Sequence, residues 1–267
     1  MRFALLLACL LPVSAQTVEI SVLGLFHPHT LEVHAASGAP VVVNGSRLEG
    51  AQRAHATLSE PPATMVTGTD GGAADFVLTV PGRISRRYHG TLEIRRADDE
   101  LLALLRTDLE TAVASVTVAE SGPGASLEAL KVQAVVSRTF FKASKKRHPS
   151  FAFCDTTHCQ YFRSPPAPHS RAARATRETR GMVLTYQGTI FPPLYSANCG
   201  GRTLLPGDVG LRVEVYPYFS VECRQKGPRR GHAVGLCQQG SAAMAAAGAD
   251  FRKILNHYYP GTLVRQD

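Results

Sequence analysis

One glutamate stands where a carboxylate could serve as both acid and base. Glu120 ends an apolar segment and precedes a Gly-Pro-Gly turn at residues 122–124, after which a helix-forming run begins at Ser126. Such a turn holds the carboxylate close to the N-terminus of the helix. A general acid that works at neutral pH needs a pKa raised by partial burial, and the apolar neighbours Val116 and Val118 fit that requirement. The alternative is an ordinary surface acid in a loop.

Two further charged side chains lie on the helix that follows. Glu128 is in the first turn, where the positive end of the helix dipole favours a carboxylate, so we expect it to stabilise the helix rather than to act as a second catalytic acid. Arg138 lies further along, where it could pair with a buried acid or contact a polar ligand. The sequence leaves both roles of Arg138 open.

Two cysteines and two histidines follow this helix within a short stretch. Cys154 and Cys159 have four residues between them, which is close enough for a local disulfide. With His148 or His158 they could instead hold zinc, whose usual ligands are cysteine and histidine. An oxidising compartment favours the disulfide, and zinc is the alternative.

Three more cysteines lie toward the C-terminus. Cys199 and Cys237 each lie in a glycine-rich turn, and the two turns could meet across a cleft, which would leave Cys223 over. An odd number of cysteines means that at least one is unpaired, bound to a metal or paired between chains. A cysteine nucleophile, Cys159 or Cys237 with His232, is the main rival to an acid catalyst, but no third group to orient the histidine is specified.

The N-terminus predicts export. Residues 1–15 have one positive charge, a short apolar core and a Val-Ser-Ala ending, which is typical of a cleavable signal and too short to span a bilayer. We therefore expect a mature chain in the periplasm, the cell wall or the extracellular space. No later stretch of the mature chain is apolar for long enough to be a transmembrane segment.

The chain is basic. It has 29 lysines and arginines against 21 acidic residues, and loss of the leader removes Arg2, so 28 remain and the mature net charge is +7. This excess favours an anionic partner, such as an envelope polymer or contact with a phospholipid membrane surface, and a solvated basic face is equally consistent with it. Export argues against nucleic acid as a partner.

The first third of the chain and the long helix differ in pattern. Short alternating or apolar runs between Gly and Pro turns predict a strand-rich region over residues 16–97, with a loop over 51–74 where the signals are weak. The segment 98–118 could form a strand, a helix or one followed by the other, because its apolar spacing fits both. A long central helix is predicted over 126–146, capped by Ser126.

Smaller elements follow the central helix. The sequence predicts a basic helix over residues 170–180, a hairpin over 182–195, and two short helices over 241–247 and 251–259. Strands and helices are mixed without regular βαβ alternation. The predicted fold class is therefore α+β, with mixed strands and helices around a long central helix.

The order of several short motifs is specific. After Glu120 come Cys-Asp-Thr-Thr-His-Cys-Gln-Tyr at 154–161, Glu-Thr-Arg-Gly-Met-Val-Leu at 178–184, Tyr-Ser-Ala-Asn-Cys-Gly-Gly-Arg-Thr at 195–203 and His-Ala-Val-Gly-Leu-Cys-Gln-Gln-Gly at 232–240. Together they closely resemble the stage II sporulation protein D / amidase enhancer LytB (SpoIID/LytB) family. We therefore divide the chain into a signal peptide (1–15), a strand-rich N-terminal region (16–97), a SpoIID/LytB-like catalytic domain (98–261) and a tail (262–267).

The resemblance implies a peptidoglycan lytic transglycosylase. Such an enzyme cleaves the glycosidic bond between N-acetylmuramic acid (MurNAc) and N-acetylglucosamine (GlcNAc), in glycan strands whose stem peptides have been removed. The family's catalytic glutamate falls on Glu120, which would protonate the glycosidic oxygen and then take the proton of the sugar's C6 hydroxyl to close a 1,6-anhydro ring. No cofactor is required. The residues expected to bind substrate are Arg138, His158, Gln160, Tyr195, Ser196, His232 and Gln238.

The same resemblance leaves a second function open. Members are also named amidase enhancers, so the chain could be a non-catalytic cell-wall-binding module that stimulates an N-acetylmuramoyl-L-alanine amidase. The expected partners are peptidoglycan glycan strands in both cases and a cell-wall amidase in the second. A structural zinc held by His148, Cys154 and Cys159 is compatible with either function.

Overall fold

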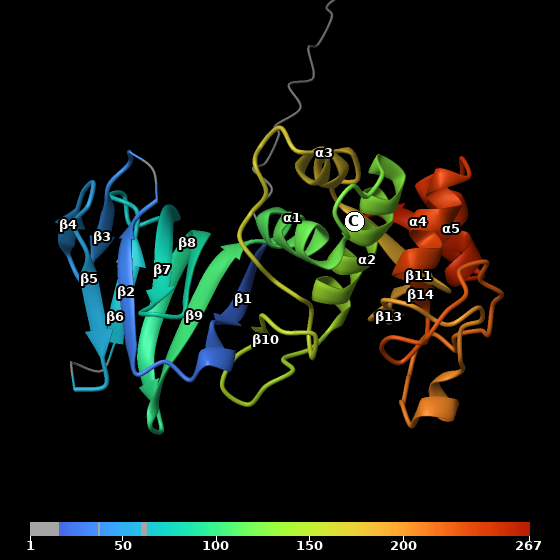
Figure 1. The fold of residues 1–267 in the computed structure, drawn as a ribbon, viewed down its shortest axis with the longest axis horizontal. Coiled ribbons are helices and arrows are strands. Elements are labelled where there is room, and N and C mark those ends of the chain that lie inside the picture. The colour runs from blue at the N-terminus through green and yellow to red at the C-terminus, as the bar shows by residue number, and fades with distance from the viewer. Residues whose placement is uncertain (1–15, 37, 60–62) are drawn as a thin grey trace, which may run out of the picture.

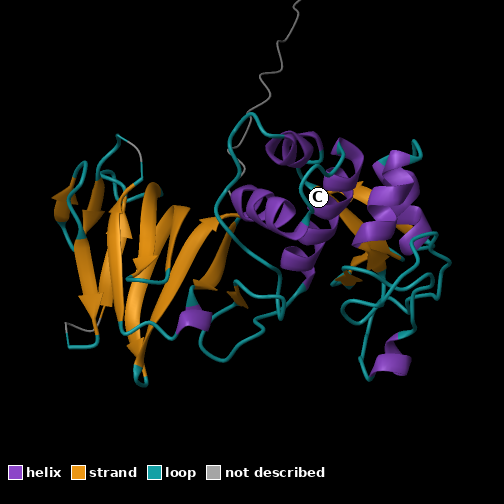
Figure 2. Cartoon of the chain, viewed as in Figure 1, coloured by secondary structure: helices purple, strands orange, loops and turns teal. Residues whose placement is uncertain are grey.

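The computed structural model describes residues 16–36, 38–59 and 63–267, so the predicted signal peptide at 1–15 lies outside the described residues. Strands gather at one end of the molecule, helices occupy the middle, and small sheets with helices form the other end (Figures 1 and 2). This arrangement is an α+β fold, as predicted. None of the helices in the described ranges combines the length and apolar character needed to cross a bilayer.

Most strands belong to one ten-stranded, mainly antiparallel sheet system. Its members are β1 (Thr17–Val22), β2 (Thr30–Ala35), β3 (Val41–Val43), β4 (Ser46–Leu48), β5 (Ala54–Thr57), β6 (Ala63–Thr67), β7 (Ala74–Val80), β8 (Ile84–Ala97), β9 (Glu100–Asp108) and β10 (Phe153–Cys154). A short 3-10 helix, η1 (Gly24–Phe26), follows β1. The strand-rich N-terminal region predicted from the sequence is therefore present.

The long strand β8 connects the two halves of this sheet system. Its first half pairs with β7, and its second half pairs with β6 and β9. Gly90 lies at the change of partner with φ 148°, and a Cβ there would lie 2.2 Å from the carbonyl oxygen of Arg106. The close approach of the two backbones therefore requires glycine.

The prediction of a loop over residues 51–74 is wrong. Strands β5 and β6 lie in this segment and pair with β2 and β8. Their residues include small and polar types with weak intrinsic strand preference, so pairing with neighbours, which the local sequence does not show, determines their conformation.

Five α-helices lie in the described residues: α1 (Leu109–Glu120), α2 (Leu127–Ala143), α3 (Arg171–Glu178), α4 (Gln238–Ala246) and α5 (Phe251–Tyr258). The ambiguous segment 98–118 is a strand followed by a helix. The change occurs at Asp108, whose carboxylate accepts a hydrogen bond from the backbone N–H of Thr111 at 3.0 Å and caps α1. The predicted cap of the central helix is confirmed, because Ser126 Oγ accepts from the backbone N–H of Ala129.

Helix α2 is the centre of the molecule (Figure 1) and packs against α1, α3, α4, α5 and the strand β11 (Met182–Tyr186). Every residue from Val132 to Phe141 is buried. Phe140 and Phe141 belong to the core of the strand-rich part, whereas Val132, Val135 and Val136 belong to a second core in the C-terminal part. A helix buried on all sides in this way joins the two halves of the chain.

The C-terminal part contains two small sheets. One has the order β12 (Thr189–Ile190), β11, β15 (Thr262–Gln266), and the other pairs β13 (Tyr195–Ser196) in parallel with β14 (Leu236–Cys237). The 3-10 helix η2 (Pro206–Val209) lies in the connection between β13 and β14. The segment predicted as a tail at 262–267 forms β15, which is antiparallel to β11 and covers its free edge.

Candidate functional site

Glu120 is the last residue of α1 and is half-buried. Its Oε1 atom accepts hydrogen bonds from the backbone N–H of Tyr161 at 2.7 Å and from the hydroxyl of Tyr195 at 2.9 Å. Its Oε2 atom accepts one from the side-chain amide of Gln238 at 3.2 Å. The carboxylate is thus fixed by donors from three segments far apart in the sequence, and Oε2 is the oxygen with more remaining capacity to accept.

Tyr195 is held as a hydrogen-bond donor. Burial, followed by the nearby charge of Glu120, raises the pKa of Tyr195 well above 10, so its hydroxyl keeps its proton. The same hydroxyl is 3.3 Å from Oε1 of Gln160, which is itself buried. Tyr195, Gln160 and Glu120 were all selected from the sequence, and the structure brings them together.

The parallel pair β13 and β14 explains how two distant motifs meet at Glu120. Tyr195 lies opposite Leu236 in this pair, and α4 begins two residues later with Gln238. The amide of Gln238 donates to the carboxylate of Glu120 and also lies 3.2 Å from both the backbone oxygen of Glu120 and Oε1 of Gln133.

Gln133 was missed by the sequence analysis. It is 3% exposed, lies in α2 and connects Gln238 to Ser137, to which its amide donates at 3.1 Å. The signal was a single amide in the apolar run Val132 to Val136, because buried amides are retained where they have partners. Gln133 therefore supports the position of Gln238.

A pocket of about 450 Å³ opens beside Glu120. Its walls are the turn at 121–126, the first turns of α2 and the face of α4 that carries Gln238, Ser241, Ala242 and Ala246. The polar groups on these walls are hydroxyls and amides, which suit a sugar with many hydroxyl groups. Among the described residues that line the pocket, Glu120 is the one carboxylate.

The structure places Arg138 away from this pocket. Its side chain is 0% exposed and forms a double hydrogen bond to Glu110 in α1, at 2.7 Å from Nε and 2.6 Å from Nη2. Nη1 also donates to the carbonyl oxygen of Met182 at 3.1 Å. The expectation that Arg138 binds substrate is therefore corrected to the structural alternative, because a fully enclosed guanidinium cannot reach a ligand.

Glu128 behaves as expected for a residue at a helix start. Its carboxylate pairs with Lys131 at 2.8 Å and accepts from the backbone N–H of Phe251 at 2.8 Å. It joins α2 to the beginning of α5 and is not among the residues that line the pocket.

Two other predicted residues are not among those that line the pocket. His232 is half-buried, its Nδ1 accepts from the backbone N–H of Val234 at 3.0 Å, and burial lowers its pKa, so the ring is neutral. Ser196 is buried beside Tyr195, and its hydroxyl has no hydrogen-bond partner in the described part of the chain. Both residues belong to the support of the β13 and β14 pair.

His158 lies in a second cluster. The ligand atoms of His148, Cys154, His158 and Cys159 all lie within 4.8 Å of one another. Nε2 of His148 is 3.3 Å from Sγ of Cys159, and Nδ1 of His158 is 3.9 Å from Sγ of Cys154. Two thiols and two imidazoles are a ligand set typical of structural zinc.

The two thiols of this cluster are not bonded to each other. Both cysteines are free, so the predicted Cys154–Cys159 disulfide is absent from the described part of the chain. A hydrogen bond between the thiols lowers the pKa of Cys154 and raises that of Cys159, so it favours the thiolate at Cys154 alone. The cluster is close to the site, because Cys159 is two residues before Tyr161, whose backbone N–H holds Glu120.

Comparison with known proteins finds a family match over part of this chain. Residues 97–186 match the SpoIID family model, described as stage II sporulation protein. The match confirms the predicted resemblance to the SpoIID family over these residues, which include Glu120 and the Cys/His cluster, and the LytB part of the resemblance stays a prediction. The family is a cell-wall-related one, of the sporulation and lytic transglycosylase type, and is associated with peptidoglycan lytic activity.

The chain is also similar to an uncharacterised protein of Brachyspira hyodysenteriae. The two are 28% identical over 119 residues, which cover 43% of this chain and 32% of that protein. The matched part thus spans about a third of the length of this curated relative.

Proposed function

We propose that this chain is a peptidoglycan lytic transglycosylase that cleaves the bond between MurNAc and GlcNAc in stem-free glycan strands, with Glu120 as its general acid and base. The observation that carries the proposal is the carboxylate of Glu120 at a pocket lined by hydroxyls and amides, fixed by Tyr161, Tyr195 and Gln238. The match of residues 97–186 to the SpoIID family supports it.

The chemistry needs one carboxyl group. In the first step Glu120 gives a proton to the glycosidic oxygen as the bond from that oxygen to C1 of MurNAc breaks. In the second step the resulting carboxylate takes the proton of the C6 hydroxyl of the same MurNAc, and the C6 oxygen bonds to C1. The products are a 1,6-anhydro sugar end and a free hydroxyl on GlcNAc, and no water is consumed.

The pocket fits a reaction with one acid better than hydrolysis. Hydrolytic glycosidases generally use two carboxyl groups on either side of the scissile bond, at separations of about 5 to 9.5 Å. Among the described lining residues there is no second Asp or Glu to play that part. Tyr195 and Gln238 would hold one carboxyl group in place for both steps.

The Cys/His cluster is given a structural role in this proposal. His148, Cys154, His158 and Cys159 would hold a zinc ion that fixes the loop leading to Tyr161, and no step of the reaction passes through it. The expected location remains the periplasm, cell wall or extracellular space, where glycan strands are the partner. Contact of the basic surface with anionic wall polymers or membrane surface is part of the same proposal.

The test compares products of the purified chain and of Glu120→Gln after incubation with stem-free glycan strands, by mass spectrometry. Anhydro-muramyl products from the unaltered chain, and a loss of at least about a hundredfold in the variant, are expected because Gln can neither give nor accept the proton. Glu214→Gln is the matched control, since Glu214 is exposed. Products formed equally by all three chains would contradict the role of Glu120.

The same experiment addresses the enhancer alternative. If no chain yields anhydro products while all bind glycan, the transglycosylase proposal fails. Stimulation of an N-acetylmuramoyl-L-alanine amidase by the unaltered chain and by Glu120→Gln to the same extent would then establish a non-catalytic cell-wall-binding enhancer.

A further inference from the structure

Three buried cysteines converge outside the Glu120 site. Cys199, Cys223 and Cys237 come from three separate segments, and their Sγ atoms all lie within 4.8 Å of one another. Their exposed fractions are 0%, 6% and 0%, and none is in a disulfide. The proposed reaction uses none of them.

Backbone donors point at one of the three sulfurs. Sγ of Cys237 accepts from the N–H of Cys199 at 3.4 Å and from the N–H of Gly240 at 3.3 Å, and it caps the N-terminus of α4. Amide donors and the positive end of a helix favour a thiolate. Burial opposes this, raising the pKa of Cys199 to about 12 and raising that of Cys237 as well, so thiolates are expected here only beside a cation.

Gly240 leaves space for the third sulfur. A Cβ at this position would lie 2.4 Å from Sγ of Cys223 and 2.0 Å from the hydroxyl oxygen of Tyr258. Any side chain at residue 240 would therefore push Cys223 away from the other two cysteines. Because residue 240, the third residue of α4, has no side chain, all three sulfurs can meet.

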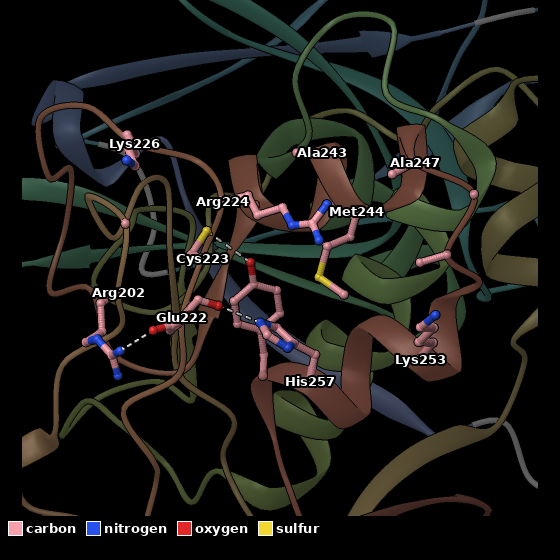
Figure 3. Close-up of a pocket in the computed structure, with 15 residues that line it drawn as sticks. Arg202, Glu222, Cys223, Arg224, Lys226, Ala243, Met244, Ala247, Lys253 and His257 are labelled. Carbon is pink, nitrogen blue, oxygen red and sulfur yellow. Dashed lines mark hydrogen bonds and ion pairs between the residues drawn. The ribbon is translucent and has the colours of Figure 1, made fainter.

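Cys223 also lies on the wall of a pocket of about 740 Å³ between α4, α5 and the segment 222–226 (Figure 3). The pocket is basic, since Arg224, Lys226 and Lys253 line it, and none of them forms an ion pair within the described part of the chain. Three thiolates carry one more negative charge than a divalent ion neutralises. Cations around the pocket would offset that excess.

We propose that Cys199, Cys223 and Cys237 are the ligands of a thiophilic metal ion, Zn²⁺ or Cu⁺, beside this basic pocket. Thiolate sets select these ions. Zinc–sulfur bonds of about 2.3 Å place sulfurs ~3.8 Å apart in a tetrahedral site, so inward shifts of at most about 1 Å bring these sulfurs to the spacing of three of its four ligands. Each thiol loses its proton to solvent as its metal–sulfur bond forms, and nothing is oxidised or reduced.

The proposal also explains the number of cysteines. Of the five cysteines in the described residues, two belong to the Cys/His cluster and three to this site, so none of these five is left over. Disulfides alone would leave at least one buried thiol without a partner.

The bound ion would join two segments that support Glu120, a consequence that rests on the proposed function. Cys199 lies four residues after Tyr195, and Cys237 lies one residue before Gln238. Both of these neighbours donate to the carboxylate of Glu120. The ion would thus act as a positioning element for the two donors.

The test measures metal bound by the full chain. Reduced protein is incubated with Zn²⁺ alone or Cu⁺ alone and desalted. The number of metal ions per chain is then measured by elemental mass spectrometry. In a Cys154→Ser/Cys159→Ser background, which removes the other cluster, one equivalent should remain, and adding Cys223→Ser should remove it. Retention of that equivalent after Cys223→Ser, or binding of neither ion in the background chain, would overturn the site.

Two measurements avoid reliance on a folded Cys223→Ser variant. Co²⁺ added to the unaltered chain and to the Cys154→Ser/Cys159→Ser chain should give a thiolate-to-cobalt absorption band in both. Gly240→Ala added to the Cys154→Ser/Cys159→Ser chain keeps the sulfurs of Cys199, Cys223 and Cys237 but should abolish the band. Peptide mapping of unreduced protein that finds a disulfide between any two of Cys199, Cys223 and Cys237 would refute the proposal. Metal content is read without glycan, so this result is independent of the cleavage assay.

Discussion

The buried pair of Arg138 and Glu110 allows a quantitative prediction. Arg138 is fully enclosed in α2, and two of its nitrogens reach the two carboxylate oxygens of Glu110 in α1. Arg138→Met keeps an unbranched apolar stem but removes the guanidinium, which leaves the Glu110 carboxylate, 17% exposed, without its partner. Removing one member of a buried ion pair costs about 3 to 5 kcal/mol, so we expect the free energy of unfolding to fall by that amount.

The loss in free energy of unfolding should be measurable by thermal and by urea-induced unfolding. At ~2 to 4 °C per kcal/mol for a chain of this size, the melting temperature should fall by about 6 to 20 °C. Arg212→Met is the matched control, because Arg212 is exposed, and its free energy of unfolding should change by less than ~0.5 kcal/mol. A double variant, Arg138→Met with Glu110→Leu, should lose less stability than the sum of the single changes, because neither charge is then left unpaired.

Binding of glycan separates this structural role from contact with substrate. Below its melting temperature, Arg138→Met should bind stem-free glycan with the affinity of the unaltered chain. If Arg138→Met has the melting temperature of the unaltered chain yet binds glycan at least tenfold more weakly, the structural assignment is refuted. Arg138 would then be a substrate-binding residue.

Three further predictions concern the site, the helices and the C-terminal strand. Tyr195→Phe should lower the turnover number by about 10- to 100-fold with glycan binding retained, because it removes a hydrogen bond to a charged group. Steady-state kinetics measures this change. An unchanged turnover number would contradict the role of Tyr195 as a donor. Hydrogen bonding to Lys131, and then to Arg174, lowers the pKa of Glu178 from 4.5 to about 2, so its carboxylate stabilises the fold above pH 4.5 and this contribution is lost as the pH falls toward 2. The difference in urea midpoint between the unaltered chain and Glu178→Gln should therefore shrink over that range, and a constant difference would show that the pairing contributes nothing. Truncation after residue 261 should lower the melting temperature and promote aggregation, measured by light scattering, because it uncovers the edge of β11.

The helices were predictable from local signals, whereas strands β5 and β15 were not. Ser126 and Ser170 cap the helices that begin after them, because a hydroxyl that accepts from a backbone N–H needs only a few neighbouring residues. Strand β5 depends on pairing with β2, and β15 depends on pairing with β11 across some eighty residues of chain. Such long-range partners leave no periodic trace in the segment itself.

The site was predictable as a set of residue types but not as a geometry. Glu120, Tyr195 and Gln238 were selected, yet nothing local shows that the parallel pairing of β13 and β14 places the last two at one carboxylate. Arg138 shows the reverse case. A charged residue in a motif suggested ligand binding, whereas its partner Glu110, 28 positions earlier, is recognisable only once α1 and α2 are packed.

The pairing of β9 with both β1 and β8 has a practical consequence for anyone who wishes to study part of this chain. The SpoIID match begins at residue 97, in the hairpin between β8 and β9. A fragment that starts there retains β9 but loses the strands on both of its sides. It would also lose Arg86, whose guanidinium lies 3.1 Å from the carboxylate of Asp155, the residue that follows Cys154 of the Cys/His cluster. Fragments designed from the family boundary would therefore carry two open strand edges and a buried acid that keeps only its more distant cation, Arg163 at 4.0 Å, and the shortest useful expression fragment begins near residue 16.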